Sequence, residues 1–270
     1  MKVFSFSIVQ VQVQVLVILV VALRRTNSFS LQGRASVYSN KCSIRKVSEN
    51  DALIETQFDD SNAESQFGTK SYWDEMYSGM GDFSSEEYSW YFGWGELKSY
   101  FMDYAPQPLK KANKKSKGSN GEPKILVPGI GNDGILLDLY NYGYRDITAF
   151  DYSQSAIDRQ LDLLSYNSQA LDNVQLKVRD ARELDVEWES EYDMIFEKGA
   201  LDAIYLSGDG YVDLAVQELK RVIKVGGIFI SVSGVVDEKL RRALFSTDDW
   251  EWLRDGSDDL KAGCFVWRKK

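Results

Sequence analysis

Histidine is absent from the 270 residues of this chain, and only two cysteines and four prolines are present. The lack of histidine excludes His-based catalytic triads, histidine general bases and most zinc sites. Cys42 and Cys264 alone form neither a disulfide framework nor a metal cluster, so we expect no bound metal. The chemistry of the chain must therefore come from carboxylates, amines, aromatic rings or a bound cofactor.

Acidic residues are absent before Glu49, whereas the same stretch contains seven lysines and arginines. The rest of the chain has 25 basic and 41 acidic residues, which is a net charge of −16. Such a charge does not favour contact with a phosphate backbone, so we expect no nucleic-acid partner. It suits a basic macromolecular substrate better, although net charge often reflects only solubility.

The most apolar part of the chain is its beginning, where sixteen of residues 3–23 are hydrophobic. The longest unbroken apolar run, residues 15–23, has the length of a signal-peptide core and is short for a membrane span. We therefore favour a cleaved signal peptide over residues 1–23, after whose removal no stable membrane span is expected. A signal anchor that holds the chain in a membrane through residues 3–23 is the alternative.

Residues 24–48 contain six basic residues, six serines and no acid, a composition typical of a transit peptide. A signal followed by such a segment resembles the bipartite presequence of algae with secondary plastids. This predicts transport into the secretory route and onward to a plastid. A disordered basic linker is the alternative.

Three segments precede the main domain. Residues 49–70 are polar and acidic and predict a flexible lead-in, whereas residues 71–104 are rich in aromatic side chains at helical spacing and predict an N-terminal helical cap. Residues 105–123 hold three of the four prolines and five lysines, which predicts an exposed loop.

Residues 124–270 alternate between strand and helix patterns, which predicts an α/β domain with a doubly wound parallel sheet. The last two strand-like runs, residues 250–253 and 264–267, are separated only by a turn-rich segment. A short turn can join only antiparallel strands, so we expect an antiparallel pair at the end of the chain. A helix over residues 212–222 is predicted to end at Gly226 and Gly227.

The most informative run is KILVPGIGNDG at residues 124–134, where an apolar strand leads into a glycine-rich turn and a helical pattern follows. Gly129 and Gly131 allow the backbone to approach a ligand at the positive end of that helix. Asp151 follows the next apolar strand, 17 residues after Gly134, where a carboxylate can accept hydrogen bonds from both hydroxyls of a ribose. The pattern predicts a cofactor that contains adenosine.

A nicotinamide cofactor is one candidate, but a dehydrogenase also needs a catalytic domain, and only 136 residues follow Gly134. The chain also has neither a histidine nor a Tyr-x-x-x-Lys pair to serve as its base. S-adenosylmethionine explains more of the sequence, because Asp180 ends the third strand where it can accept from the adenine amino group, and Tyr152 can lie on an adenine face. The alternative for Asp151 and Asp180 is that each only caps the next helix.

Three segments resemble one branch of the class I methyltransferases, the branch that contains the elongation factor 1-alpha lysine methyltransferases. They are YWDEMY at residues 72–77, the glycine turn with Asn132, and FEKGALDA at residues 196–203. The resemblance covers roughly residues 71–270. It implies a Rossmann-like doubly wound sheet of seven strands in the order 3-2-1-4-5-7-6, with the last strand antiparallel.

The resemblance also implies S-adenosylmethionine as cofactor and a protein lysine as methyl acceptor. The cofactor contacts that it implies, together with Gly131 of the turn, are Trp73, Tyr77, Trp90, Gly129, Asp151, Tyr152, Asp180, Ala181 and Lys198.

Several of these residues allow a second interpretation. Trp73 and Tyr77 are four residues apart and share a helix face, so they can close the pocket and favour a sulfonium through their rings. They can equally pack the N-terminal helix onto the sheet, and the same choice applies to Trp90. Lys198 beside Glu197 can also be an ordinary surface pair.

The glycine turn departs from the pattern of its relatives, which commonly have GCGNS where this chain has GIGND. Asp133 places a negative charge near the cofactor's methionine carboxylate, which could weaken affinity, although it also suits a helix N-terminus.

Methyl transfer from a sulfonium is an in-line displacement that depends mainly on positioning and on the exclusion of water. Glu197 is a candidate to orient an amine nucleophile, with a helix-start acid as the alternative, and no catalytic residue is assigned. The competing functions are a small-molecule methyltransferase or aminopropyl transferase of the same fold, and an inactive cofactor-binding or scaffold domain.

Overall fold

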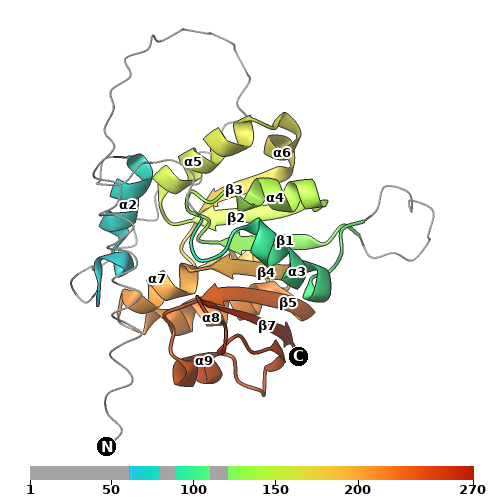
Figure 1. Ribbon diagram of the computed structural model, residues 1–270. Helices are drawn as coiled ribbons and strands as arrows, with labels where there is room; N and C mark the ends of the chain where they lie inside the picture. The colour runs from blue at the N-terminus through green and yellow to red at the C-terminus, as the bar shows by residue number, and fades with distance from the viewer. Residues whose placement is uncertain (1–60, 62, 80–88, 110–120, 209) are drawn as a thin grey trace, which may run out of the picture. The chain divides into compact units, whose positions relative to one another are not determined.

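The computed structural model describes residues 61, 63–79, 89–109, 121–208 and 210–270 (Figure 1). The predicted signal segment, the transit-like segment and most of the lysine-rich loop lie outside the described residues. Of the predicted lead-in, the 3-10 helix η2 (Gln66–Gly68) is described, and the Glu64 N–H donates to the Leu206 carbonyl at 2.9 Å. The described end of this segment thus has a defined structure beside α7, and the rest of the predicted lead-in lies outside the described residues.

Seven strands form one sheet in the order β3-β2-β1-β4-β5-β7-β6. Strands β1 to β5 run parallel, and β7 runs antiparallel to both β5 and β6. The strands are β1 (Lys124–Pro128), β2 (Asp146–Asp151), β3 (Val174–Val178), β4 (Tyr192–Lys198), β5 (Ile223–Ser233), β6 (Trp250–Arg254) and β7 (Gly263–Lys269). The predicted strand order and the antiparallel last strand are confirmed.

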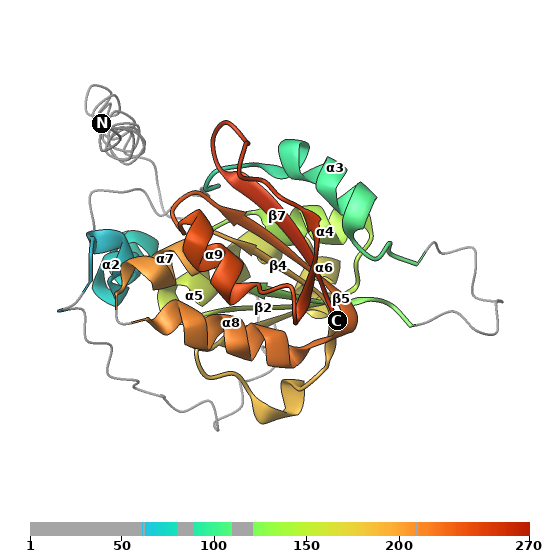
Figure 2. The ribbon, with the colours of Figure 1, turned by 90° about the horizontal axis from the view of Figure 1, so that it is seen from below.

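The helices of the described residues cover both faces of the sheet (Figure 2). They are α2 (Lys70–Ser78), α3 (Trp94–Tyr104), α4 (Ile135–Tyr142), α5 (Gln154–Ser165), α6 (Ser168–Asn173), α7 (Ala200–Leu206), α8 (Tyr211–Val222) and α9 (Glu238–Leu244), with a 3-10 turn η3 (Val186–Trp188). Successive side chains of a strand point to opposite faces, so Ile125 and Val127 pack under α3, α4 and α5. Leu126 faces the other side, where α7, α8 and α9 pack.

Helix α8 ends at Val222 and not at the predicted Gly226-Gly227 pair. The chain enters the sheet at once, because Ile223 already pairs with Tyr192 of β4. The next pairing joins Ile228 to Met194, so the two glycines lie in a bulge of β5, where Gly226 has φ +79°. Glycine permits this conformation without strain, and here it marks a bulge and not the end of a helix.

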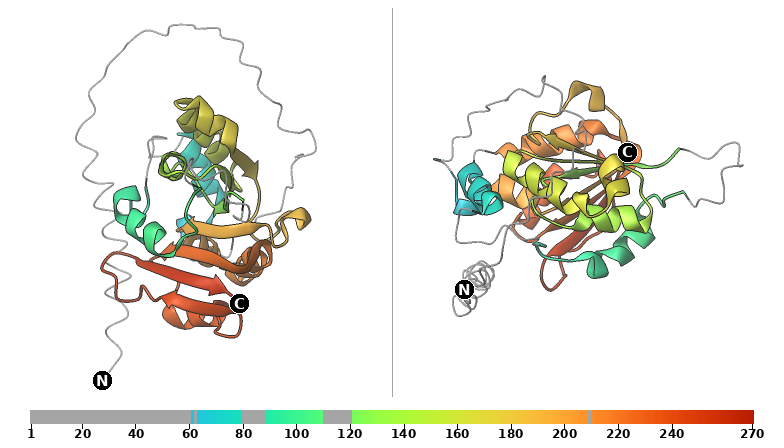
Figure 3. Two further views of the ribbon diagram at one scale, coloured as in Figure 1. Left: turned by 90° about the vertical axis from the view of Figure 1, so that its right-hand side faces the viewer. Right: turned by 90° about the horizontal axis from the view of Figure 1, so that it is seen from above.

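The predicted N-terminal cap consists of two helices with different positions. Helix α3 lies on a sheet face, where Leu97 and Phe101 are fully buried in the core. Helix α2 packs against α5 at the edge where the parallel strands end, and the right panel of Figure 3 shows it in cyan beyond the strands. None of the helices in the described ranges is long and apolar enough to cross a membrane.

Candidate functional site

The glycine turn, residues 129–134, joins the end of β1 to the start of α4. Gly129 and Gly131 have φ values of +58° and +54°, a region that favours glycine. A Cβ atom on Gly131 would lie 2.6 Å from the Tyr77 hydroxyl, and one on Gly129 would lie 2.5 Å from the Ala200 Cβ. Glycine at both positions is therefore required by backbone angle and by close approach.

Asp151 ends β2 directly beside this turn and is only 3% exposed. Its carboxylate accepts the Gly131 N–H and the Ser153 N–H, each at 2.9 Å. Burial raises its pKa to about 6, although these two hydrogen bonds act in the opposite direction. An ionised carboxylate offers about four lone-pair sites, so acceptor capacity remains for the two hydroxyls of a ribose.

Asp180 lies near Asp151, because the Arg179 N–H donates to the Asp151 carbonyl at 2.9 Å. Its carboxylate accepts hydrogen bonds from Arg182. The guanidinium Nη2 and Nε of Arg182 lie 2.6 and 3.0 Å from the Asp180 Oδ2, and the backbone N–H of Arg182 donates to Oδ1 at 2.9 Å. An adenine amino group would have to share this carboxylate with Arg182. The next residue, Ala181, is buried in the core under α7 and α8.

The predicted aromatic residues gather in one aromatic cluster, made up of Phe67, Tyr72, Trp73, Tyr77, Trp90 and Tyr152, around Met76 and Ala156. Trp73 and Tyr77 stack at 5.7 Å with an interplanar angle of 23°, and Trp90 meets Trp73 edge-on at 5.7 Å. The Trp73 indole N–H donates to the Phe67 carbonyl at 2.8 Å. The cluster packs α2 onto α5, which is the packing interpretation of Trp73 and Tyr77. The Tyr77 hydroxyl also lies beside Gly131 of the glycine turn, and a role of these rings in covering the cofactor stays a prediction.

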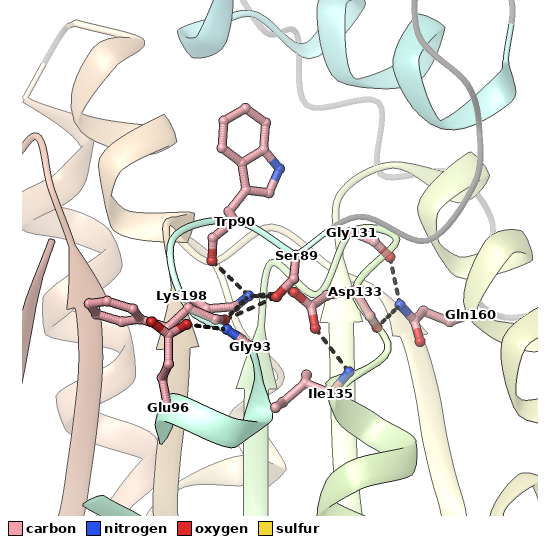
Figure 4. A network of polar contacts seen from close by, with 10 residues as sticks. Ser89, Trp90, Gly93, Glu96, Gly131, Asp133, Ile135, Gln160 and Lys198 are labelled. Carbon is pink, nitrogen blue, oxygen red and sulfur yellow. Dashed lines mark hydrogen bonds and ion pairs between the residues drawn. The ribbon is translucent and has the colours of Figure 1, made fainter. Parts of the chain in front are cut away.

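Asp133 of the glycine turn forms an ion pair with Lys198 at 2.5 Å (Figure 4). Its other carboxylate oxygen accepts the Ile135 N–H at 2.9 Å, which caps the start of α4. The negative charge that could repel the cofactor's carboxylate is therefore paired. Burial lowers the pKa of Lys198, whereas Asp133 raises it.

Gln160 is a site residue that sequence reasoning missed. It is 1% exposed, and its amide donates to the Gly131 and Asp133 carbonyls at 2.8 and 2.9 Å, which fixes the glycine turn from α5. A signal exists in the sequence, since Gln160 falls between Ile157 and Leu164 on the apolar face of that helix. A buried amide on such a face needs partners.

Glu197 is fully buried at the end of β4. Its carboxyl accepts the Ser231 hydroxyl and the Leu201 N–H, the latter at 3.2 Å, and burial raises its pKa to about 8. A carboxyl without exposed surface cannot orient a substrate amine in this structure. The helix-start interpretation is the one that fits, because the group lies at the start of α7.

Asp202 in the segment FEKGALDA was given no role by sequence reasoning, yet it joins two loops. Its 3% exposed carboxylate accepts the Tyr91 hydroxyl at 2.7 Å and the Ser233 hydroxyl at 2.6 Å. It also accepts the N–H groups of Gly234 and Val236 at 2.8 and 3.1 Å. The loop before α3 and the loop after β5 are thereby tied to α7.

A family model described as a methyltransferase domain matches residues 124–261, which contain the whole glycine turn, Asp151 and Asp180. The chain belongs to this methyltransferase family. The methyltransferase is 31% identical over 172 residues to EEF1A lysine methyltransferase 2 of Homo sapiens. The matched stretch covers 63% of this chain and 69% of that protein.

Two further relatives match at lower identity. EEF1A lysine methyltransferase 4 of Mus musculus is 26% identical over 196 residues, covering 68% of this chain and 69% of that protein. The eEF1A lysine and N-terminal methyltransferase of Homo sapiens is 25% identical over 191 residues, covering 68% of this chain. This methyltransferase spans only 24% of that last relative, which is a much longer protein.

Solved structures share the fold of this methyltransferase. One comes from work on the conversion of a disulfide bond into a thioacetal group during echinomycin biosynthesis, with a TM-score of 0.56 and 15% identity over 74% of this chain and 92% of that chain. The PH0226 protein of Pyrococcus horikoshii OT3 has a TM-score of 0.52 and 16% identity over 66% and 89% of the two chains. At such identities the likeness concerns the fold alone.

Family and fold together make the chain a class I methyltransferase that uses S-adenosylmethionine. The residues present fit this cofactor, because Gly129 and Gly131 give the turn after β1 the conformation of a close backbone approach and Asp151 keeps acceptor capacity beside the aromatic cluster. Asp151 would hold the ribose, and Tyr152, Trp73, Tyr77 and Trp90 would cover the cofactor. When bound, S-adenosylmethionine supplies the methyl group on its sulfonium.

Proposed function

We propose that this methyltransferase acts on a lysine side chain of a protein. The observation that carries the proposal is the 31% identity to EEF1A lysine methyltransferase 2, since the match spans 69% of that enzyme. The segment FEKGALDA, which first indicated this branch, supplies Lys198 and Asp202, and both hold the loop beside the cofactor residues. The branch-specific residues thus support the geometry of the site.

The charge of the chain favours a basic protein as the acceptor. Residues 49–270 carry a net charge of −16, which attracts lysine-bearing surfaces and repels nucleic acid. A lysine amine must lose its proton before it attacks, and its unperturbed pKa is about 10.4. We assign the enzyme the tasks of positioning this amine and excluding water, and no catalytic base is named.

The acceptor class can be tested by transfer of a labelled methyl group from S-adenosylmethionine into proteins of the native compartment. We expect label on lysine residues, identified by mass spectrometry of the labelled peptides, and much less label with the Asp151→Asn variant at a limiting concentration of S-adenosylmethionine. Label found only in small molecules would replace the proposal by a small-molecule methyltransferase. Transfer of an aminopropyl group would indicate the related transferase, and isothermal titration without any binding of S-adenosylmethionine would indicate a scaffold domain.

We also propose that residues 1–48 direct the chain into the secretory route and onward to a plastid. The support is compositional: an apolar run of nine residues is followed by a basic, serine-rich segment without acids. In such a compartment the enzyme would not meet cytosolic EEF1A, so the acceptor would be another protein. Sequencing of the mature N-terminus and imaging of a tagged chain test this, and an intact residue 1–23 segment in membranes would favour the signal anchor.

A further inference from the structure

The ammonium of Lys198 lies at the centre of a polar network between the glycine turn and the loop of residues 89–92 (Figure 4). It approaches four oxygen atoms: the Asp133 carboxylate at 2.5 Å, the Ser89 hydroxyl at 2.6 Å, and the carbonyls of Trp90 and Phe92 at 2.8 and 3.0 Å. Lys198 and Asp133 are 65 residues apart in the chain, and Lys198 and Trp90 are 108 apart. The network therefore joins three distant parts of the sequence.

This ammonium has no capacity left for a further ligand. A lysine ammonium has three N–H donors, and four acceptors already lie within hydrogen-bond distance. Its side chain is 5% exposed, and that of Asp133 is 11% exposed. Binding a cofactor carboxylate through Lys198 would require the release of Asp133 or of the 89–92 loop.

The 89–92 loop carries two side chains that matter for the site. Trp90 belongs to the aromatic cluster, where its ring contacts that of Trp73. Tyr152, the residue after Asp151, packs against the same cluster. Tyr91 has φ +62° and donates its hydroxyl to Asp202. A backbone held in this unfavourable region persists only where its surroundings fix it.

We propose that Lys198 and Asp133 are positioning residues that fasten the 89–92 loop to the glycine turn and so hold Trp90 over the adenosine part of the cofactor. In this role Lys198 does not contact the cofactor, unlike the direct contact that the family resemblance implies. Asp133 contributes to affinity and does not oppose it.

The two roles of Lys198 are distinguished by ligands with and without a methionine carboxylate. S-adenosylhomocysteine contains that carboxylate, whereas 5′-methylthioadenosine contains only the adenosine and a methylthio group. If Lys198 fastens the loop, Lys198→Met leaves only a small fraction of molecules with the loop in place, and both ligands lose about tenfold in affinity. Isothermal titration of the full chain with each ligand measures this loss.

Asp133→Asn gives a second test that keeps the shape of the side chain. The expected change in affinity has opposite signs when Lys198 fastens the loop and when it binds the cofactor's carboxylate directly. We expect weaker binding of both ligands, because a buried ammonium without its partner no longer holds the loop. This variant also serves if Lys198→Met does not fold. Hydrogen exchange of the peptide that contains residues 89–97 should become faster in both variants, while exchange in the central strands stays unchanged.

The control is Lys224→Met, which removes the lysine of the Lys224–Asp193 ion pair, whose charges lie 2.7 Å apart near the amino ends of β5 and β4. It should leave both affinities unchanged. Loss of affinity confined to S-adenosylhomocysteine would overturn the proposal in favour of direct carboxylate binding. Tighter binding by Asp133→Asn, or unchanged affinity in Lys198→Met, would overturn it as well. None of these measurements depends on the acceptor, so the lysine proposal and this one can fail separately.

Discussion

Two buried carboxyl groups, Asp151 at the end of β2 and Glu197 near the end of β4, lie at the carboxyl ends of parallel strands but in different surroundings. Both have raised pKa values, about 6 and about 8, and burial is the main cause in each. Asp151 accepts two backbone N–H groups and keeps acceptor capacity beside the aromatic cluster, whereas Glu197 is enclosed by Ser231 and the start of α7. The more strongly perturbed group is therefore the structural one, and a raised pKa alone does not identify a ligand site.

The largest effect that separates the two groups is expected in the stability of Glu197→Gln. Because the pKa of Glu197 is raised from 4.5 to about 8, its neutral form stabilises the fold fully below the ordinary value, and this stability is lost as the pH rises through 8. Between pH 5 and 8 the wild type should lose about 3 kcal/mol more of its free energy of unfolding than Glu197→Gln. Urea titrations across this range measure the difference.

The same variant should bind S-adenosylmethionine like the wild type, because Glu197 is enclosed. Parallel stability curves for the two proteins would contradict the assigned burial of a neutral acid. A large loss of cofactor affinity in Glu197→Gln would remove the contrast with Asp151.

The next largest effect is expected for Asp151→Asn on cofactor binding. Two charge-assisted hydrogen bonds to the ribose would be weakened, so the Kd for S-adenosylmethionine should rise about 100-fold. Isothermal titration gives the value, and Asp146→Asn at the other end of β2 is the matched control with unchanged affinity. An equal loss in both variants would mean that Asp151 is not a ribose ligand.

A pH profile of binding sharpens the role of Asp151. With a pKa of about 6, this carboxyl is ionised at pH 8 and mostly protonated at pH 5. If only the ionised form accepts both ribose hydroxyls, affinity at pH 5 should be about tenfold lower than at pH 8. Asp151→Asn should give a flat profile in the same titrations, and a wild-type profile that is also flat would show that ionisation of Asp151 does not matter.

The smallest effect is expected for Asp180, which follows β3. Arg182 already occupies much of its carboxylate, so Asp180→Asn should raise the Kd for S-adenosylmethionine by only about fivefold. Arg182→Ala, measured beside it, should not weaken binding, since it frees the carboxylate for the adenine amino group. A loss as large as that of Asp151→Asn would make Asp180 the main adenosine ligand.

The fold could be predicted from the sequence because local patterns determine it. An apolar run before the glycine turn marked β1, one that ends in Asp151 marked β2, and one shortly before Asp180 marked β3. The closing antiparallel strands were visible from their spacing. The end of α8 was not predicted, because pairing of Ile223 with Tyr192 overrides the local signal of Gly226. Pairing between distant strands is a tertiary effect that a single sequence window does not contain.

The site was predictable only in part. The glycine turn and Asp151 were predicted from local spacing, and Trp73, Tyr77 and Trp90 from the family resemblance. The structure brings these residues to neighbouring places, and their contacts with the cofactor stay predictions. The partners of Asp133 and Asp202 were not predicted, since Lys198 and Tyr91 lie 65 and 111 residues away from them. Sequence position indicates that a carboxylate lies at the carboxyl ends of the parallel strands. Whether this carboxylate is available to a ligand depends on long-range contacts.

The hydrogen bond between Tyr91 and Asp202 also bears on how the protein comes into being. Synthesis at 5–20 residues per second takes roughly 5 to 20 s to add the 111 residues between them. Once residue 134 has been added, the growing chain carries Trp90 and the glycine turn but not yet Lys198, Asp202 or the strand β5. The residues that fasten the 89–92 loop therefore come from the second half of the sequence. A chain truncated before Lys198 is not expected to consume S-adenosylmethionine.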